Sequence, residues 1–232
     1  PWGPDNTDYP EAPNLFEHID ATAPLTMMTN LNGLTTCKVL NEKYLKDYTY
    51  NNYYHHNGKN AAISLAMEYG GAGWQYAYAP VPAVPTPSGT SGWYLPSIGQ
   101  WFLMFANLSG LDPNKLEIAT DPHSGKAYCL SWLFHSSEER RKYLKVFTNY
   151  FDTRTNSILE RYYNERRIPE STFFLPGEDQ IEWYLWACDE AMSNGEACCV
   201  RITGTSIDFT YLDKRQGEMQ ANGYAARSVI AF

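Results

Sequence analysis

The sequence contains no run of about 18 apolar residues, and it is short of positive charge. The first absence excludes a membrane-spanning helix from the 232 residues, because a span needs close to 20 apolar residues. Lysine and arginine together number 18, against 26 aspartates and glutamates, for a formal net charge of −8. An acidic chain without a basic stripe is poorly suited to nucleic acid or to an anionic membrane surface. We therefore predict no nucleic-acid partner and no direct membrane insertion.

Motifs for metal binding and nucleophilic catalysis are also missing. The cysteines form no Cys-x-x-Cys, and His55-His56 have no other ligand type at metal-binding spacing. His123 and His135 have no recognisable nucleophile motif beside them. Acidic pairs such as Asp189-Glu190 are expected in turns or at helix starts, where carboxylates are solvated. We predict no catalytic residue, no metal and no cofactor.

The five cysteines do not form an even set, so at least one thiol is unpaired within the chain. They are Cys37, Cys129, Cys188, Cys198 and Cys199. Adjacent cysteines on a strand point to opposite faces, so at most one of Cys198 and Cys199 can meet Cys188. We expect buried free thiols, which is the usual state of cysteine outside a disulfide framework.

The abundant residues are aromatic: 7 Trp, 18 Tyr and 10 Phe. Tyrosine and tryptophan serve cores, and they also serve surfaces that contact sugars or proteins. Residues 70–92 are rich in glycine and proline, and Trp74, Tyr76 and Tyr78 alternate ahead of the prolines. A loop this long inside a domain is functional or flexible. We predict that these three aromatics form a ligand-contact surface; the alternative is that Trp74 and Tyr76 pin the loop to the core.

Residues 92–110 form the strongest local pattern in the chain. Residues 93–95 predict a short buried strand, which Pro96 separates from a helix. Ser97 and Gln100 have the spacing of a capping box, and Gly110 stands where a glycine ends a helix. An apolar face follows at helical spacing: Ile98, Trp101, Phe102, Phe105 and Leu108. We predict that this strand and helix organise the core.

The remaining segments predict one domain with an extension. Residues 1–29, with prolines among polar residues, predict an extended arm or linker, and residues 30–232 predict the domain. A chain that begins with Pro1 is expected to be a processed or trimmed product. Residues 31–40 are expected to be weakly structured, and 59–69 predict a helix. From residue 172 the apolar period becomes two, which predicts an antiparallel meander over 180–186, 197–203, 206–212 and 224–232.

Two stretches of the sequence resemble one protein family. Gly92-Trp-Tyr-Leu-Pro-Ser-Ile-Gly-Gln-Trp101 is similar to its GWxLPSxGQW segment, and Arg227-Ser-Val-Ile-Ala-Phe232 to its terminal VRPVxAF strand. This family is the bacterial C-type-lectin-like domain of the Legionella-collagen-like C-terminal kind, found on surface proteins of Gram-negative gut anaerobes. Trp183-Tyr184-Leu185-Trp186 takes the place of the family's aromatic strand. Lys214 takes the place of its late lysine, and Arg227 that of its terminal-strand arginine.

The resemblance implies an α+β, C-type-lectin-like fold, with two or three helices packed on an antiparallel sheet and a long irregular loop. It implies an extracytoplasmic protein, at the cell surface or secreted, that binds a glycan or a host or bacterial surface protein without catalysis. Lys214 and Arg227 are then structural, pairing with backbone carbonyls or acids near the terminal strand. Lectin-like calcium sites need an oxygen-rich loop. The only near match, Asp112-Pro113-Asn114, is expected to be a turn.

Two alternatives accompany this interpretation. In the first, the chain is a structural tip or stalk domain of a surface fibre or lipoprotein, with residues 1–26 as its tether. Less favoured is an oxidase-like enzyme, because the related fold of the formylglycine-generating oxidases uses a reactive cysteine pair near the C-terminal end. Cys188 and Cys198 or Cys199 lie in that region, but their spacing differs from that of the oxidases.

Overall fold

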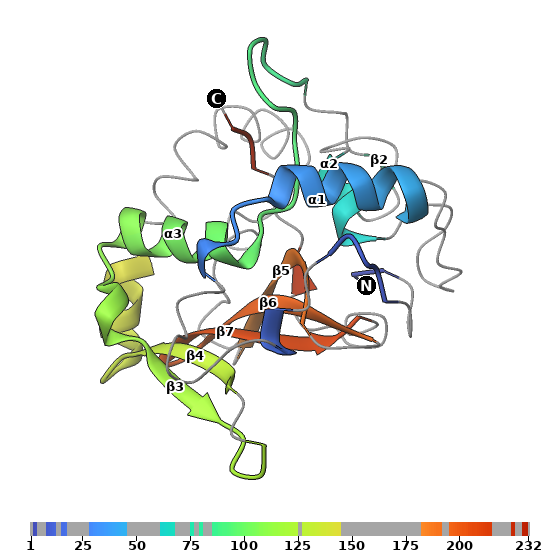
Figure 1. Cartoon of the computed structure of the whole chain (residues 1–232). Coiled ribbons are helices and arrows are strands. Elements are labelled where there is room, and N and C mark those ends of the chain that lie inside the picture. Colours follow the sequence, from blue (N-terminus) through green and yellow to red (C-terminus); the bar gives the residue numbers. More distant parts are fainter. Residues whose placement is uncertain are drawn as a thin grey trace.

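The computed structural model describes residues 2–3, 8–12, 15–17, 28–45, 61–67, 75–76, 79–80, 85–124, 127–144, 182–191, 195–214, 224–225 and 229–231. In these residues, helices pack on a six-stranded sheet of order β3-β4-β7-β6-β5-β8 (Figure 1). The strands are β3 (Glu117–Thr120), β4 (Ala127–Leu133), β5 (Glu182–Glu190), β6 (Glu196–Thr203), β7 (Ser206–Asp213) and β8 (Tyr224–Ala225). A separate two-stranded sheet joins β1 (Gln75–Tyr76) to β2 (Ala79–Pro80). The α+β class is therefore confirmed.

The helices lie before the sheet in the sequence or between its strands. They are η1 (Leu15–Glu17), α1 (Gly33–Leu40), η3 (Asn41–Leu45), α2 (Ala62–Met67), α3 (Ile98–Ser109), η4 (Pro113–Lys115) and a helix at 137–144. The helix predicted over 59–69 is confirmed for its described part, α2. Residues 33–40 form α1, so the expectation of weak structure there was wrong. Burial explains the difference, because Thr36, Cys37 and Leu40 are covered on the face that packs toward β5.

The predicted meander is correct for three strands and wrong for the fourth. β5, β6 and β7 pair antiparallel in sequence order, but β8 pairs parallel with β5. Both edges of β6 and of β7 are already paired with neighbouring strands. The chain that follows β7 therefore joins the sheet at the free edge of β5. β5 itself continues to Glu190, beyond the predicted end at residue 186. β3 and β4 were not predicted as strands.

One face of the sheet is covered by α3, and its centre is aromatic. Phe102 stacks on Trp132 with ring centres 5.2 Å apart, and Phe209 meets both rings edge-on. Trp101 is buried and donates its indole N–H to the carbonyl oxygen of Trp186 at 3.0 Å. The predicted capping box is confirmed at Ser97, and Gly110 ends the helix with a φ of 68°. Helix α3 therefore organises this core, as its sequence pattern indicates.

The second core lies on the other face of β5 and β6. Alternation along the strands assigns Tyr184, Trp186 and Cys188 to it, while Leu185 and Ala187 face α3. Its other members come from α1, α2 and the N-terminal residues. Cys198 and Cys199 fall in different cores, as the alternation predicted.

The described residues of the predicted arm, 1–29, pack into both cores. Trp2 and Tyr9 are buried in the core beside α1, and Phe16 is buried in the core beside α3. Backbone hydrogen bonds hold them in place: Trp2 N–H donates to Lys214 O, and Phe16 N–H donates to Ala191 O, both at 2.8 Å. This segment therefore contributes apolar surface to the same body as the sheet.

The two stretches that carry the family resemblance lie side by side. Tyr94 and Val229 form an antiparallel bridge with reciprocal backbone hydrogen bonds of 3.0 and 2.9 Å. Ser91 N–H donates to Ala231 O at 2.9 Å. The buried strand predicted over 93–95 is reduced to this single bridge at Tyr94. The next two carbonyl oxygens, of Leu95 and Pro96, accept the thiol of Cys37 and the N–H of Cys188.

We expect Gly99→Ala to destabilise the fold by about 1–3 kcal/mol, as overpacking does. A Cβ at Gly99 would lie 2.4 Å from Asn30 O and 2.7 Å from Met28 O, so the start of α3 would have to move off this backbone. Gly204→Ala is the matched control, because a Cβ there has open space around it. Equal denaturation midpoints for the two variants would contradict this account of Gly99.

Candidate functional site

The structure describes only part of the predicted aromatic contact surface. Tyr76 belongs to β1, where its backbone pairs with Ala79, and Gln75 pairs with Pro80. Trp74 and Tyr78 lie outside the described residues, as does the side chain of Tyr76. Of the three predicted contact residues, only the backbone of Tyr76 is therefore described. The contact surface itself remains a prediction.

A buried ion pair, which the sequence did not predict as a site, lies at the end of β5. Lys214 Nζ contacts Glu190 Oε1, and both side chains are 0% exposed. The second Glu190 oxygen accepts the backbone N–H of Tyr9 at 2.9 Å. The ammonium group of Lys214 also lies 5.0 Å from the ring centres of Trp2 and Tyr9, within cation–π range. We call Trp2, Tyr9, Glu190 and Lys214 the N-terminal clamp, because together they fasten the start of the chain to the sheet.

The neighbouring Asp189 is buried at the start of α3. Its Oδ2 accepts the N–H of Ile98, the first residue of the helix, at 2.6 Å. Its Oδ1 accepts an amide N–H of Asn30 at 2.8 Å. The partial positive charge of a helix N-terminus favours a carboxylate there. Asp189 and the Ser97–Gln100 box therefore share the unpaired N–H groups of the first turn.

The expectation that Asp189 and Glu190 are solvated was wrong. Both are 0% exposed, because the N-terminal segment and the start of α3 cover the end of β5. Burial raises the pKa of Asp189 to about 7, against the lowering by the N–H groups of Ile98 and Asn30. Burial likewise raises the pKa of Glu190 to about 7, against the lowering by Lys214 and by the N–H of Tyr9.

All five cysteines are buried and free. Burial raises the pKa of Cys188 and Cys198 well above the usual range for a thiol, and it raises that of Cys199 and Cys129 as well. The thiolate is the nucleophilic form of cysteine. These four thiols are therefore neutral and enclosed, which is the opposite of the environment that activates a catalytic cysteine.

Lys214 pairs with an acid, as the resemblance implied. Its partner, Glu190, lies on β5, the strand beside terminal strand β8. Arg227, the other residue expected to be structural, lies outside the described residues. Asp112-Pro113-Asn114 forms a capped turn at η4, where the Asp112 side chain accepts the N–H of Asn114.

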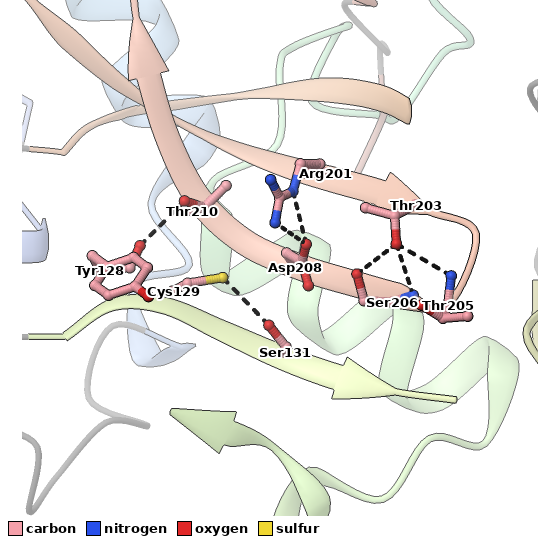
Figure 2. Close-up of polar contacts among 9 residues, drawn as sticks. All are labelled: Tyr128, Cys129, Ser131, Arg201, Thr203, Thr205, Ser206, Asp208 and Thr210. Atoms are coloured by element: carbon pink, nitrogen blue, oxygen red, sulfur yellow. Dashed lines mark hydrogen bonds and ion pairs between the residues drawn. The ribbon is translucent and has the colours of Figure 1, made fainter. Parts of the chain in front are cut away.

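A second polar cluster lies on the face of β4, β6 and β7 opposite α3. Figure 2 shows its side chains, which include Cys129, Ser131, Arg201, Asp208 and Thr210. Arg201 and Asp208 are direct cross-strand partners, and Nε and Nη2 of Arg201 each lie 2.8 Å from Asp208 Oδ2. The Asp208 side chain is 2% exposed and that of Arg201 is 37% exposed. This arrangement joins two strands and leaves the Arg201 side chain partly exposed.

The described residues contain no group of three or more His, Cys, Asp or Glu side chains that could hold a metal ion. None of the helices in the described part of the chain has the length and apolarity of a membrane span. Comparisons with family models, with curated proteins and with solved structures find no match to this chain.

Proposed function

We propose that this chain is a non-enzymatic recognition module with a C-type-lectin-like fold, located outside the cytoplasm at a cell surface or secreted. Its ligand is a glycan or a host or bacterial surface protein. Trp74, Tyr76 and Tyr78 make the contact. The observation that carries this proposal is the hairpin of β1 and β2, which forms its own small sheet apart from the six-stranded one.

The alternation of the three aromatics in the sequence supports their role in ligand contact. Alternate residues of an extended strand share a face, and Trp74 and Tyr76 have this spacing in the sequence. Flat rings with polar edges suit both sugar rings and protein surfaces. The adjacency of Tyr94 and Val229 supports the fold assignment, because it joins the two stretches that resemble the family.

The buried groups support recognition over catalysis. The acids at the end of β5 bind Lys214, the first N–H of α3 and the N–H of Tyr9, and the five thiols are buried. These groups stabilise the fold and expose no nucleophile to a substrate.

The second candidate is a structural tip or stalk domain of a surface fibre or lipoprotein. The N-terminal clamp favours this candidate, because the clamp attaches residues 2 and 9, which belong to the proposed tether, to the sheet. This candidate predicts a dedicated protein partner and no small ligand.

We expect Trp74→Ala to weaken ligand binding about tenfold, which corresponds to about 1.4 kcal/mol, because it removes one ring of the contact surface. The measurement is a glycan array together with a pull-down of surface proteins, each with and without calcium. Tyr128→Ala is the control, because Tyr128 is also an exposed aromatic, at 44%, but lies on β4.

The outcomes separate the two candidates. A sugar bound by the wild type and lost in the Trp74 variant supports a lectin-like module. A protein partner bound by the wild type and lost in the Trp74 variant also supports the recognition module, whereas a blank array with a protein partner that both proteins bind supports the tip or stalk domain. Folded wild-type protein that binds nothing in either assay, or a Trp74 variant that binds like the wild type, contradicts the proposed contact surface.

A further inference from the structure

Arg140 is a buried cation that has no acidic partner among the described residues. It lies on the helix at 137–144 and is 7% exposed. Its Nη1 donates to the carbonyl oxygen of Thr203, at the end of β6. Its Nε is buried and has no hydrogen-bond partner. The ion pairs in the described part of the chain involve Lys43, Arg201 and Lys214, so none of them includes Arg140.

The helix that carries Arg140 does not supply a counter-ion. On a helix, the side chains three and four positions away are the neighbours of a residue. None of these is acidic: they are Ser136, Ser137, Tyr143 and Leu144. Glu139 is adjacent in the sequence, but its Oε2 accepts the backbone N–H of His135 at 2.8 Å. Glu138, two positions away, belongs to a different side of the helix and is exposed.

A positive charge therefore remains at this position without compensation by the described residues. Burial lowers the pKa of Arg140, and the neighbouring cation Arg141 lowers it further. A guanidinium nevertheless stays protonated in proteins. A buried charge without a partner is unfavourable, and so is a buried N–H group without an acceptor. An anion bound at Arg140 would relieve both.

The hydrogen bond to Thr203 leaves one edge of the guanidinium available. Nη1 is used for that bond, whereas Nε and Nη2 form the other edge and donate to none of the described residues. Two parallel N–H groups on such an edge match the two oxygens of a carboxylate. A carboxylate also carries a single negative charge, which one guanidinium neutralises. A dianion would leave a net charge in a buried position.

Arg140 contacts the rim of the fold, at the turn between β6 and β7. Figure 2 shows this turn, in which Thr203 Oγ1 accepts the N–H groups of Thr205 and Ser206. Phe134 N–H donates to Thr205 O at 2.9 Å, which holds the start of the helix beside the turn. Residues 204–205 and 135–137 are exposed. The available edge therefore belongs to a side chain that joins two exposed segments, where a small ligand can approach.

We propose that Arg140, positioned by the β6–β7 turn, binds a ligand that carries a carboxylate group, with Nε and Nη2 donating to its two oxygens. Nη1 stays on Thr203 O and fixes the plane of the guanidinium. Small organic acids and acidic sugars both offer this group. The proposal does not depend on the contact surface of Trp74, Tyr76 and Tyr78, so the two can fail separately.

The test follows the Nε–H signal of Arg140 in a nitrogen–proton correlation NMR spectrum of the whole chain. The signal is identified by its absence from Arg140→Lys. Acetate is added to about 100 mM, which saturates a site of millimolar affinity, at constant ionic strength set with chloride and at a slightly acidic pH where acetate is ionised. We expect a saturable shift of this signal. A signal that does not move, or that moves without saturation, would overturn the proposal.

Two further probes distinguish the sources of the carboxylate. Glucuronate is an acidic sugar, and glucose is its neutral counterpart. Glucuronate is expected to shift the same signal and glucose to leave it in place. Glucuronate that binds more tightly than acetate supports an acidic sugar, and equal affinities support a small organic acid. A shift produced by glucose as well would overturn the role of the carboxylate.

Variants give a second readout, by calorimetric titration with acetate. Arg140→Lys keeps the charge but loses the two parallel donors, and we expect its affinity to fall at least about tenfold. Arg141→Gln is the matched control, because it removes an exposed cation from the same helix, and its affinity is expected to stay within about twofold of the wild type. Equal losses in the two variants would show that acetate follows the general positive potential of the helix, and would overturn the proposal.

Discussion

Replacing Lys214 by methionine is expected to lower the free energy of unfolding by about 3–5 kcal/mol, the range observed when one partner of a buried ion pair is removed. The substitution leaves the Glu190 carboxyl buried without its cation. It also removes the charge that lies 5.0 Å from the rings of Trp2 and Tyr9, so the N-terminal clamp loses its centre. Urea denaturation followed by tryptophan fluorescence measures the change, at a pH above the Glu190 pKa of about 7 so that both members of the pair are ionised.

A double-mutant cycle separates the ion pair from the packing of the lysine stem. Glu190→Gln combined with Lys214→Met is expected to be at least about 2 kcal/mol more stable than the sum of the single changes implies, because no buried charge is left unpaired. Lys43→Met is the matched control, since Lys43 and Glu11 form an exposed ion pair whose lysine side chain is 54% exposed. Exposed pairs contribute little. A Lys43 variant as destabilised as the Lys214 variant would contradict the role assigned to burial.

Local patterns explain which parts of the fold could be predicted. The start of α3 is decided by Ser97 and Gln100, and its end by Gly110, all within or beside the helix. The hairpin between β6 and β7 is likewise decided by its turn, where Thr203 Oγ1 accepts the N–H groups of Thr205 and Ser206. Such signals are complete within a few residues, so the sequence shows them directly.

Features that depend on distant partners were missed. Glu190 resembles a turn acid in the sequence, and it is buried by residues 2 and 9, which lie more than 180 positions away. The direction of β8 depends on which sheet edge remains open after β5, β6 and β7 have paired. No local pattern carries that information. Lys214 was singled out only through the family resemblance, which supplied a role but no partner.

The predicted contact surface and the buried clusters rest on different kinds of observation. Trp74, Tyr76 and Tyr78 rest on composition and alternation, with one backbone position described in β1. The clamp and Asp189 rest on hydrogen bonds and an ion pair between segments that lie far apart in the sequence. The contact surface is therefore tested by binding, whereas the buried clusters lead to quantitative predictions about the free energy of unfolding.

The free energy of unfolding is expected to fall as the pH rises from about 4 through 7, with Asp189 as a principal cause. Its pKa is about 7 in the native protein and 3.8 for an ordinary aspartate, so in this range the native state holds a proton that the unfolded chain has released. Stability is therefore greatest on the acidic side of this window and is lost as Asp189 ionises. The difference between the two pKa values corresponds to about 4 kcal/mol, and Glu190 acts in the same direction because its pKa is also raised.

Asp189→Asn tests this assignment, because asparagine cannot titrate and keeps an oxygen to accept the N–H of Ile98. The total change in stability across the window is expected to fall to about half of the wild-type value, with the remainder due to Glu190. Asp121→Asn is the control: Asp121 is near the surface, and the N–H groups of Ser124 and His123 lower its pKa, so its removal leaves the fall in place. Denaturant titrations at a series of pH values give the measurement. If the Asp189→Asn variant shows the same pH dependence as the wild type, the titrating group is not Asp189. The Asp189 carboxylate would then be ionised across the whole pH range.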